Sequence, residues 1–145
     1  MTSILEEKDS IRELIANYCF YYDDAMFEQW VDLWTDDAVF NVDGKTLRGR
    51  AALQQFTREA RLVNGKPSVK HLTMNQVIEV NGHTAIARCY LLTMMKRKDG
   101  TLTAVTAGVY NDKLVKTDRG WRFAERTLRG DLRWSNPPVD SAGKG

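Results

Sequence analysis

Residues 17–24, Asn17-Tyr18-Cys19-Phe20-Tyr21-Tyr22-Asp23-Asp24, have the pattern of the last turns of an amphipathic helix. Apolar side chains recur at helical spacing before and through this stretch, at Ile11, Leu14, Ile15, Tyr18, Cys19 and Tyr22. Asp23 follows Cys19 by four residues, which places its carboxylate at the edge of the buried stripe. A carboxylate there needs a partner or a wet cavity, because burying a bare charge is costly. Asp23 is therefore a candidate general base, or a group that orients one.

The bulk composition indicates one soluble domain. The chain has 145 residues, 43% of them hydrophobic and 28% charged, which is ordinary for a globular protein. The net charge of +2, without any block of like charge, excludes an obvious nucleic-acid partner. Cys19 and Cys89 lie in apolar runs and are predicted to be buried free thiols, although a disulfide stays open at this point.

Targeting signals are not evident. The N-terminal residues lack the apolar region of a signal peptide, and no apolar run approaches the ~20 residues that span a bilayer. We expect a cytoplasmic protein with no membrane partner.

Helical patterns come first along the chain and strand patterns follow. Ser10 and Glu13 have capping-box spacing, so the first helix is predicted to begin at Ser10 and to end near Tyr22. The later elements are expected as a helical segment at 26–34, a strand at 38–42, a helix at 50–63, and strands at 69–80, 84–96, 102–116 and 121–133. Asn81-Gly82 and Asp99-Gly100 mark hairpin turns between the long strands.

This order predicts an α+β domain. Strands longer than ten residues curl, because twist accumulates along them. We therefore expect a curved mixed or antiparallel sheet with about three N-terminal helices over its concave face, enclosing a cone-shaped ligand site. Residues 1–134 would form this single domain, and residues 135–145 an extended or disordered tail.

His71 is the second candidate for chemistry. Counted in steps of two along its strand, it shares a face with Val69, Thr73, Asn75 and Val77, which suits a pocket wall. The other histidine, His83, directly follows the Asn-Gly turn and is expected to be exposed. An aspartate bonded to one ring nitrogen of His71 would fix its tautomer and stabilise the imidazolium. A structural histidine bonded to a backbone carbonyl is the alternative.

The chain resembles the SnoaL-like branch of the nuclear transport factor 2-like superfamily over about Ile4 to Trp134. The segments that carry the resemblance are 11–15, 22–23, 34–38, 49–50, 70–71, 81–82, 109–112 and 120–123. It is most similar to the group of scytalone dehydratase, the bile acid 7α-dehydratases and hexachlorocyclohexane dehydrochlorinase. Asp23 and His71 match that group's aspartate and histidine by position. The resemblance implies a cystatin-like cone and removal of a proton with loss of water or halide, without a cofactor.

Further residues are predicted to line the pocket. The resemblance implies that a tyrosine such as Tyr18 or Tyr22 orients substrate, that Tyr90 occupies a polar pocket position, and that Arg126 stabilises the leaving group. Asn75 shares the predicted face of His71 and is expected to bind a substrate oxygen. Trp34 and Phe40 are expected to complete an aromatic lining. Core packing of the aromatic residues and a solvated Arg126 are the alternatives. The second histidine of scytalone dehydratase-like enzymes is missing near Tyr90.

These observations favour a cofactor-independent lyase, a dehydratase or dehydrohalogenase, acting on a hydrophobic cyclic small molecule. Two isolated histidines leave too few ligands for a metal site. One alternative is a ketosteroid isomerase-like or polyketide cyclase-like enzyme with Asp23 as base. Another is a non-catalytic ligand-binding or accessory subunit resembling the β subunit of ring-hydroxylating dioxygenases. Apolar residues on the outer face of the sheet, such as Met94, Leu102 and Val105, predict a homodimer or homotrimer.

Overall fold

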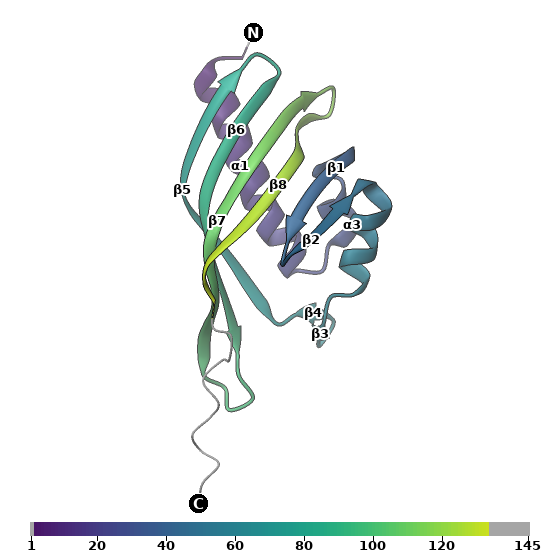
Figure 1. The fold of residues 1–145 in the computed structure, drawn as a ribbon, viewed down its shortest axis with the longest axis vertical. Coiled ribbons are helices and arrows are strands. Elements are labelled where there is room, and N and C mark those ends of the chain that lie inside the picture. Colours follow the sequence, from purple (N-terminus) through teal and green to yellow (C-terminus); the bar gives the residue numbers. More distant parts are fainter. Residues whose placement is uncertain (1, 134–145) are drawn as a thin grey trace, which may run out of the picture.

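The chain folds into helices laid against one long curved sheet (Figure 1). The structure, a computed structural model, describes residues 2–133, so the predicted tail at 135–145 lies outside the described residues. The elements in chain order are α1 (Ile4–Asp23), α2 (Phe27–Val31), β1 (Trp34–Val42), β2 (Lys45–Arg48), α3 (Gly49–Arg58), β3 (Leu62–Val63), β4 (Lys66–Pro67), β5 (Val69–Asn81), β6 (Thr84–Lys96), β7 (Leu102–Thr117) and β8 (Gly120–Arg133).

The large sheet has the strand order β2-β1-β8-β7-β6-β5 and does not close on itself. Only the β1–β8 pair is parallel, and the other neighbours in this sheet are antiparallel. Helix α1 crosses one face of the sheet and packs mainly against β5 (Figure 1). The predicted α+β class, with N-terminal helices on a curved mixed sheet, is confirmed.

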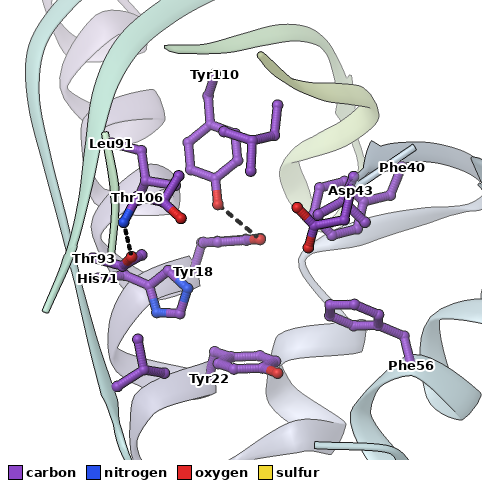
Figure 2. A pocket seen from close by; sticks show the side chains of 13 residues that line it. Tyr18, Tyr22, Phe40, Asp43, Phe56, His71, Leu91, Thr93, Thr106 and Tyr110 are labelled. Carbon is purple, nitrogen blue, oxygen red and sulfur yellow. Dashed lines mark hydrogen bonds between the residues drawn. The ribbon is translucent and has the colours of Figure 1, made fainter. Parts of the chain in front are cut away.

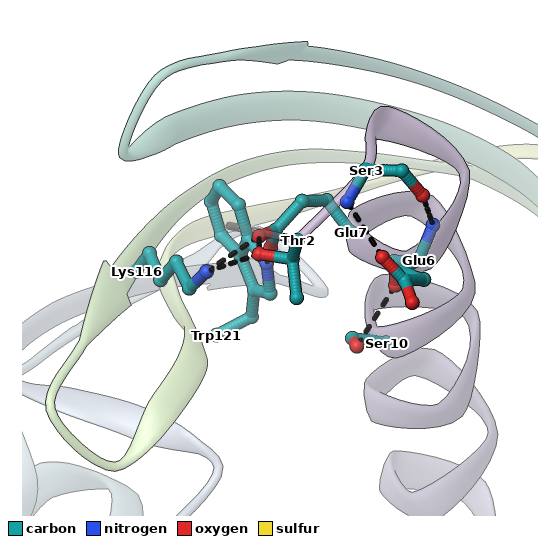
Figure 3. Close-up of polar contacts among 7 residues, drawn as sticks. All are labelled: Thr2, Ser3, Glu6, Glu7, Ser10, Lys116 and Trp121. Atoms are coloured by element: carbon teal, nitrogen blue, oxygen red, sulfur yellow. Dashed lines mark hydrogen bonds and ion pairs between the residues drawn. The ribbon is translucent and has the colours of Figure 1, made fainter.

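Helix α1 begins earlier than the sequence pattern predicted. The Ser3 hydroxyl accepts the Glu6 backbone N–H, and the Glu6 carboxylate accepts the Ser3 backbone N–H, so the capping box is Ser3–Glu6 (Figure 3). Ser10 lies within the helix and donates its hydroxyl to the Glu6 carbonyl. The first turn was missed because Ile4 and Leu5 are exposed, so the buried stripe starts only at Glu7.

Two of the β-bulges in this sheet decide which way predicted site residues face. In β5, Met74 pairs with Tyr90 and Val77 with Arg88, so two residues oppose one, and Asn75 adopts a left-handed φ of 60°. In β8, Glu125 pairs with Lys113 and Phe123 with Leu114, which leaves Ala124 as an extra residue. Each bulge reverses the inward and outward alternation beyond it.

The core between α1 and the sheet is strongly aromatic. Tyr18, Trp30, Trp34, Phe40 and Phe123 are each nearly fully buried and contact one another with ring centroids 5.0–6.4 Å apart. Such pairs each contribute about 0.5–1.5 kcal/mol beyond the area they bury. Cys19 and Cys89 are both buried free thiols, as predicted. Burial raises the pKa of the Cys89 thiol to about 12, so this thiol stays protonated.

A polar cluster around Glu7 links the start of α1 to the end of β7 and the start of β8 (Figure 3). The Glu7 carboxylate accepts hydrogen bonds from Lys116 Nζ, the Thr2 hydroxyl and Trp121 Nε1, the last at 2.6 Å. These donors, Lys116 foremost, lower the pKa of Glu7 from its ordinary value to about 2.

We expect this cluster to make stability depend on pH. Because the folded-state pKa is depressed, ionised Glu7 stabilises the fold fully above its unfolded value of 4.5 and loses this effect as pH falls toward about 2. In thermal unfolding, wild type should exceed Glu7→Gln in Tm at about pH 6.5, and the difference should shrink steadily toward pH 3. Glu13→Gln, on the exposed side of α1, controls for loss of a helix charge. A difference that is constant over this range would contradict the assignment.

Candidate active site

The end of α1 and the start of β5 meet through Asp23 and His71. Asp23 Oδ1 lies 2.6 Å from His71 Nδ1, and Asp23 Oδ2 accepts the backbone N–H of His71 at 2.8 Å. The Asp23 side chain is 5% exposed and the His71 side chain 14%. Both oxygens of this buried carboxylate are thus bonded to a single residue, 48 positions along the chain. The two residues singled out from the sequence therefore lie in direct contact.

This contact fixes the chemistry open to the imidazole. A carboxylate accepts hydrogen bonds, so in the neutral ring Nδ1 carries the proton and Nε2 the basic lone pair. The rings of Tyr18 and Tyr22 meet the His71 ring edge-on, with centroids 6.4 and 5.4 Å away. The imidazole is therefore oriented by Asp23 on one side and by aromatic rings on the other, which is the arrangement of an oriented general base.

His71 forms part of the wall of a cavity of about 190 Å³ (Figure 2). Most of the wall is aromatic or aliphatic, and polar side chains reach it from the sheet and from the β1–β2 turn. The lining residues are Tyr18, Tyr22, Phe40, Val42, Asp43, Phe56, Val69, His71, Leu91, Thr93, Thr106, Tyr110 and Leu128. The cavity is thus a small, mainly apolar chamber with a few polar groups at its edge.

Three of the predicted binding residues, Tyr18, Tyr22 and Phe40, lie in this wall with His71. Burial raises the pKa of the Tyr18 and Tyr22 phenols, so both remain protonated and able to donate. The Tyr18 hydroxyl lies 3.4 Å from that of Tyr110 on β7 (Figure 2). The wall therefore presents phenol donors close to the imidazole.

Trp34 and Arg126 are placed behind the wall instead of in it. Trp34 is fully buried between Phe40 and Phe123 and contributes to the core. Arg126 is fully buried, donates from Nε and Nη2 to Asp112 at 2.8 and 3.1 Å, and stacks its guanidinium on the ring of Tyr18. Strict alternation would put Arg126 on the face opposite Phe123, and the bulge at Ala124 reverses this.

Asn75 and Tyr90 do not reach the cavity. The bulge in β5 turns Asn75 outward, so the expected continuation of the His71 face ends at Thr73. On β6 the inward residues are Ala85, Ala87, Cys89, Leu91 and Thr93, and Tyr90 lies on the exposed outer face between them. The predicted pocket positions of Asn75 and Tyr90 are corrected accordingly.

The sequence reasoning missed Tyr110 and Asp112. Both alternate with Leu114 on the inner face of β7, where period-two spacing could have revealed them. An aspartate at an inward strand position needs a cation, and Arg126 supplies it. Burial raises the pKa of Asp112 and the Arg126 guanidinium counteracts this.

No set of three or more His, Cys, Asp or Glu side chains among residues 2–133 is grouped so as to hold a metal ion. None of the helices in this part of the chain combines the length and apolar character of a membrane span.

Comparisons with known proteins agree on the fold. The profile described as SnoaL-like domain matches residues 3–127. A function unknown protein from Mycobacterium tuberculosis is 32% identical, with a TM-score of 0.78 over 94% of this chain and 84% of that one. An NTF2-like protein with a cystatin-like fold from Novosphingobium aromaticivorans is 28% identical, with a TM-score of 0.76 over 86% and 82%. A candidate scytalone dehydratase from the same bacterium is 22% identical, with a TM-score of 0.73 over 88% and 86%, which is a likeness of fold. A search of curated protein sequences returned no significant match.

Proposed function

Because the chain belongs to the family of SnoaL-like domains, which includes cofactor-independent enzymes, we propose that it is a cofactor-independent lyase acting on a hydrophobic cyclic small molecule. The observation that carries this proposal is the bond between Asp23 Oδ1 and His71 Nδ1 at 2.6 Å, at the wall of an aromatic cavity. An oriented imidazole beside an apolar chamber is suited to removing a proton from carbon.

In the proposed reaction, His71 Nε2 takes a proton from a ring carbon, the C–H electron pair forms a double bond to a neighbouring carbon, and that carbon loses hydroxide or halide. Asp23 stabilises the imidazolium that forms, because its charge lies against Nδ1. The protonated Tyr18 and Tyr22 phenols donate to the departing group or to a carbonyl oxygen. General-base catalysis typically contributes ~10²–10⁴-fold, and one well-placed donor in a dry site about 10²–10³-fold.

The dimensions of the cavity favour a small substrate. Its volume of about 190 Å³ is below the roughly 300–1,000 Å³ of pockets that enclose drug-sized ligands. We therefore favour a substrate with one or two rings over a polycyclic one. The reaction class is favoured over an isomerase with Asp23 as base, because both Asp23 oxygens are already bonded to His71.

We also propose a homodimer or homotrimer that covers the outer face of the sheet. Large apolar side chains are exposed there on β5 and β6, among them Val77, Ile86 and Tyr90. Proteins with this fold bind small molecules, and some are subunits of oligomers. Exposed apolar patches of this kind are typical of association surfaces.

Asp23→Asn tests the proposed role of the carboxylate. With chlorinated and hydroxylated rings screened for loss of water or hydrogen halide, the variant should lose about 10²-fold in kcat/KM, because a misoriented base costs that much. Asp24→Asn is the matched control, since Asp24 is the next residue and pairs with Lys66 at the surface at 3.0 Å. If a folded Asp23→Asn protein had the same turnover as wild type, this would contradict the proposal.

A further inference from the structure

A much larger depression lies beside the cavity, between the C-terminal half of α1, the segment before β5, and the projecting end of the β6–β7 hairpin. Figure 1 shows this hairpin extending past the helices. The depression has a volume of about 1370 Å³ and shares Val69 and His71 with the cavity. We call it the basic groove; its apolar side is formed by α1 and β5–β7, and its cations come from the segment before β5, from β5 itself and from the hairpin.

The apolar side of the basic groove is unusually open to solvent. Phe20 on α1 is 65% exposed and Leu102 at the start of β7 is 72% exposed, and both line the groove. Leu72 on β5 and the methionines at the end of β6 continue the apolar surface between them. Large apolar side chains gathered in one concavity indicate a ligand surface, whereas scattered ones need no explanation.

The charged side chains of the groove are almost all of one sign. Arg61, Lys70, Lys96 and Lys98 are exposed cations among its lining residues. Asp23 is the only acidic side chain among the described lining residues, and it is buried against His71. This balance differs from that of the whole chain, in which 21 basic residues face 19 acidic ones. The groove therefore has a local positive field above an apolar floor.

We propose that the basic groove binds an amphipathic anion, with its aliphatic or ring carbons against Phe20, Leu72 and Leu102 and its carboxylate, sulfate or phosphate among the cations of the rim. Charge complementarity favours this occupant over a second copy of the chain. In a two-fold dimer the same surface of both copies meets, so the four cations of one copy would lie against the same four of the other. This proposal does not depend on the proposed elimination reaction, because ligand binding to the groove is measured without turnover.

The experiment measures displacement of 1-anilinonaphthalene-8-sulfonate by four ten-carbon ligands: decanoate, decyl phosphate, decanol and decyltrimethylammonium. Both anions should bind at least fivefold more tightly than the alcohol, and the cation should bind most weakly. Raising sodium chloride from about 0.05 to 0.5 M should weaken the binding of the two anions only. A difference between decanoate and decyl phosphate identifies the preferred head group.

Variants separate the two halves of the site. Lys96→Gln/Lys98→Gln should remove most of the preference for anions, by about fivefold per cation. Lys45→Gln/Arg119→Gln removes the same charge outside the groove and should leave the preference intact. Phe20→Ser and Leu102→Ser, at exposed positions, should weaken the binding of all four ligands. Decanol binding as tightly as decanoate, or identical behaviour of the two charge variants, would overturn the proposal. An oligomer that Leu102→Ser dissociates would assign the groove to a second copy and overturn it too.

Discussion

Replacing His71 by alanine is expected to lower kcat/KM about 10²–10⁴-fold, the usual contribution of a general base. The reason is geometric: Nε2 of His71 is the basic ring nitrogen that the bond to Asp23 leaves available. His83→Ala is the control, because His83 is exposed at the β5–β6 turn and is the only other histidine. Steady-state rates on the substrate found by screening give the measurement.

Alanine at position 71 also leaves Asp23 without its side-chain partner, so loss of fold must be separated from loss of base. His71→Asn is the second variant, because an amide N–H can still donate toward Asp23 but cannot accept a proton at neutral pH. We expect its Tm to lie within a few degrees of the wild-type Tm and its kcat/KM to fall about 10²-fold or more. A folded His71→Asn protein with near wild-type turnover would exclude His71 as the base.

The second large effect concerns stability. Arg126→Met should lower the free energy of unfolding by about 3–5 kcal/mol, because it leaves the Asp112 carboxylate buried without its bidentate partner. The double variant Arg126→Met/Asp112→Leu should recover most of this loss, since replacing both members of a buried pair by apolar groups is often nearly neutral. Urea unfolding at neutral pH measures both.

Arg129→Met supplies the comparison for this pair. Arg129 bonds Asp131 on the same strand, but the two side chains are largely exposed. A solvent-exposed pair typically contributes ~0–1 kcal/mol, so this variant should unfold close to wild type. If Arg126→Met proved no more harmful than Arg129→Met, the buried Asp112–Arg126 pair would not have the stabilising role predicted here.

Much of the architecture was predictable because two periodicities dominate the chain. The helical stripe ending at Tyr22 placed Asp23 at the edge of the core, and period-two spacing placed His71 on the inward face of its strand. The two meet because α1 packs on β5. A contact across 48 residues follows from packing, however, and the sequence pattern alone could only make each residue a candidate.

Bulges explain where the strand alternation failed at Asn75 and Arg126. A bulge adds a residue to one strand and exchanges inside for outside beyond it, and neither bulge has a signature in the sequence. Asn75 was therefore expected in the pocket and lies outside it. For Arg126, strict alternation from Phe123 would have favoured the solvated alternative, whereas the bulge turns its side chain into the core behind the pocket wall. Tyr90 was placed in the pocket by resemblance alone, although the simple alternation of β6 puts it on the outer face, where it lies.

The bond between Asp23 and His71 can be tested without any substrate. Two-bond ¹⁵N–¹H correlation spectra of histidine-labelled protein report which ring nitrogen carries the proton, and exposed His83 provides the internal reference. Above the titration range of the ring, we predict that His71 is protonated at Nδ1 in wild type and that this preference weakens in Asp23→Asn. A His71 ring protonated at Nε2, or a tautomer unchanged by Asp23→Asn, would contradict the account.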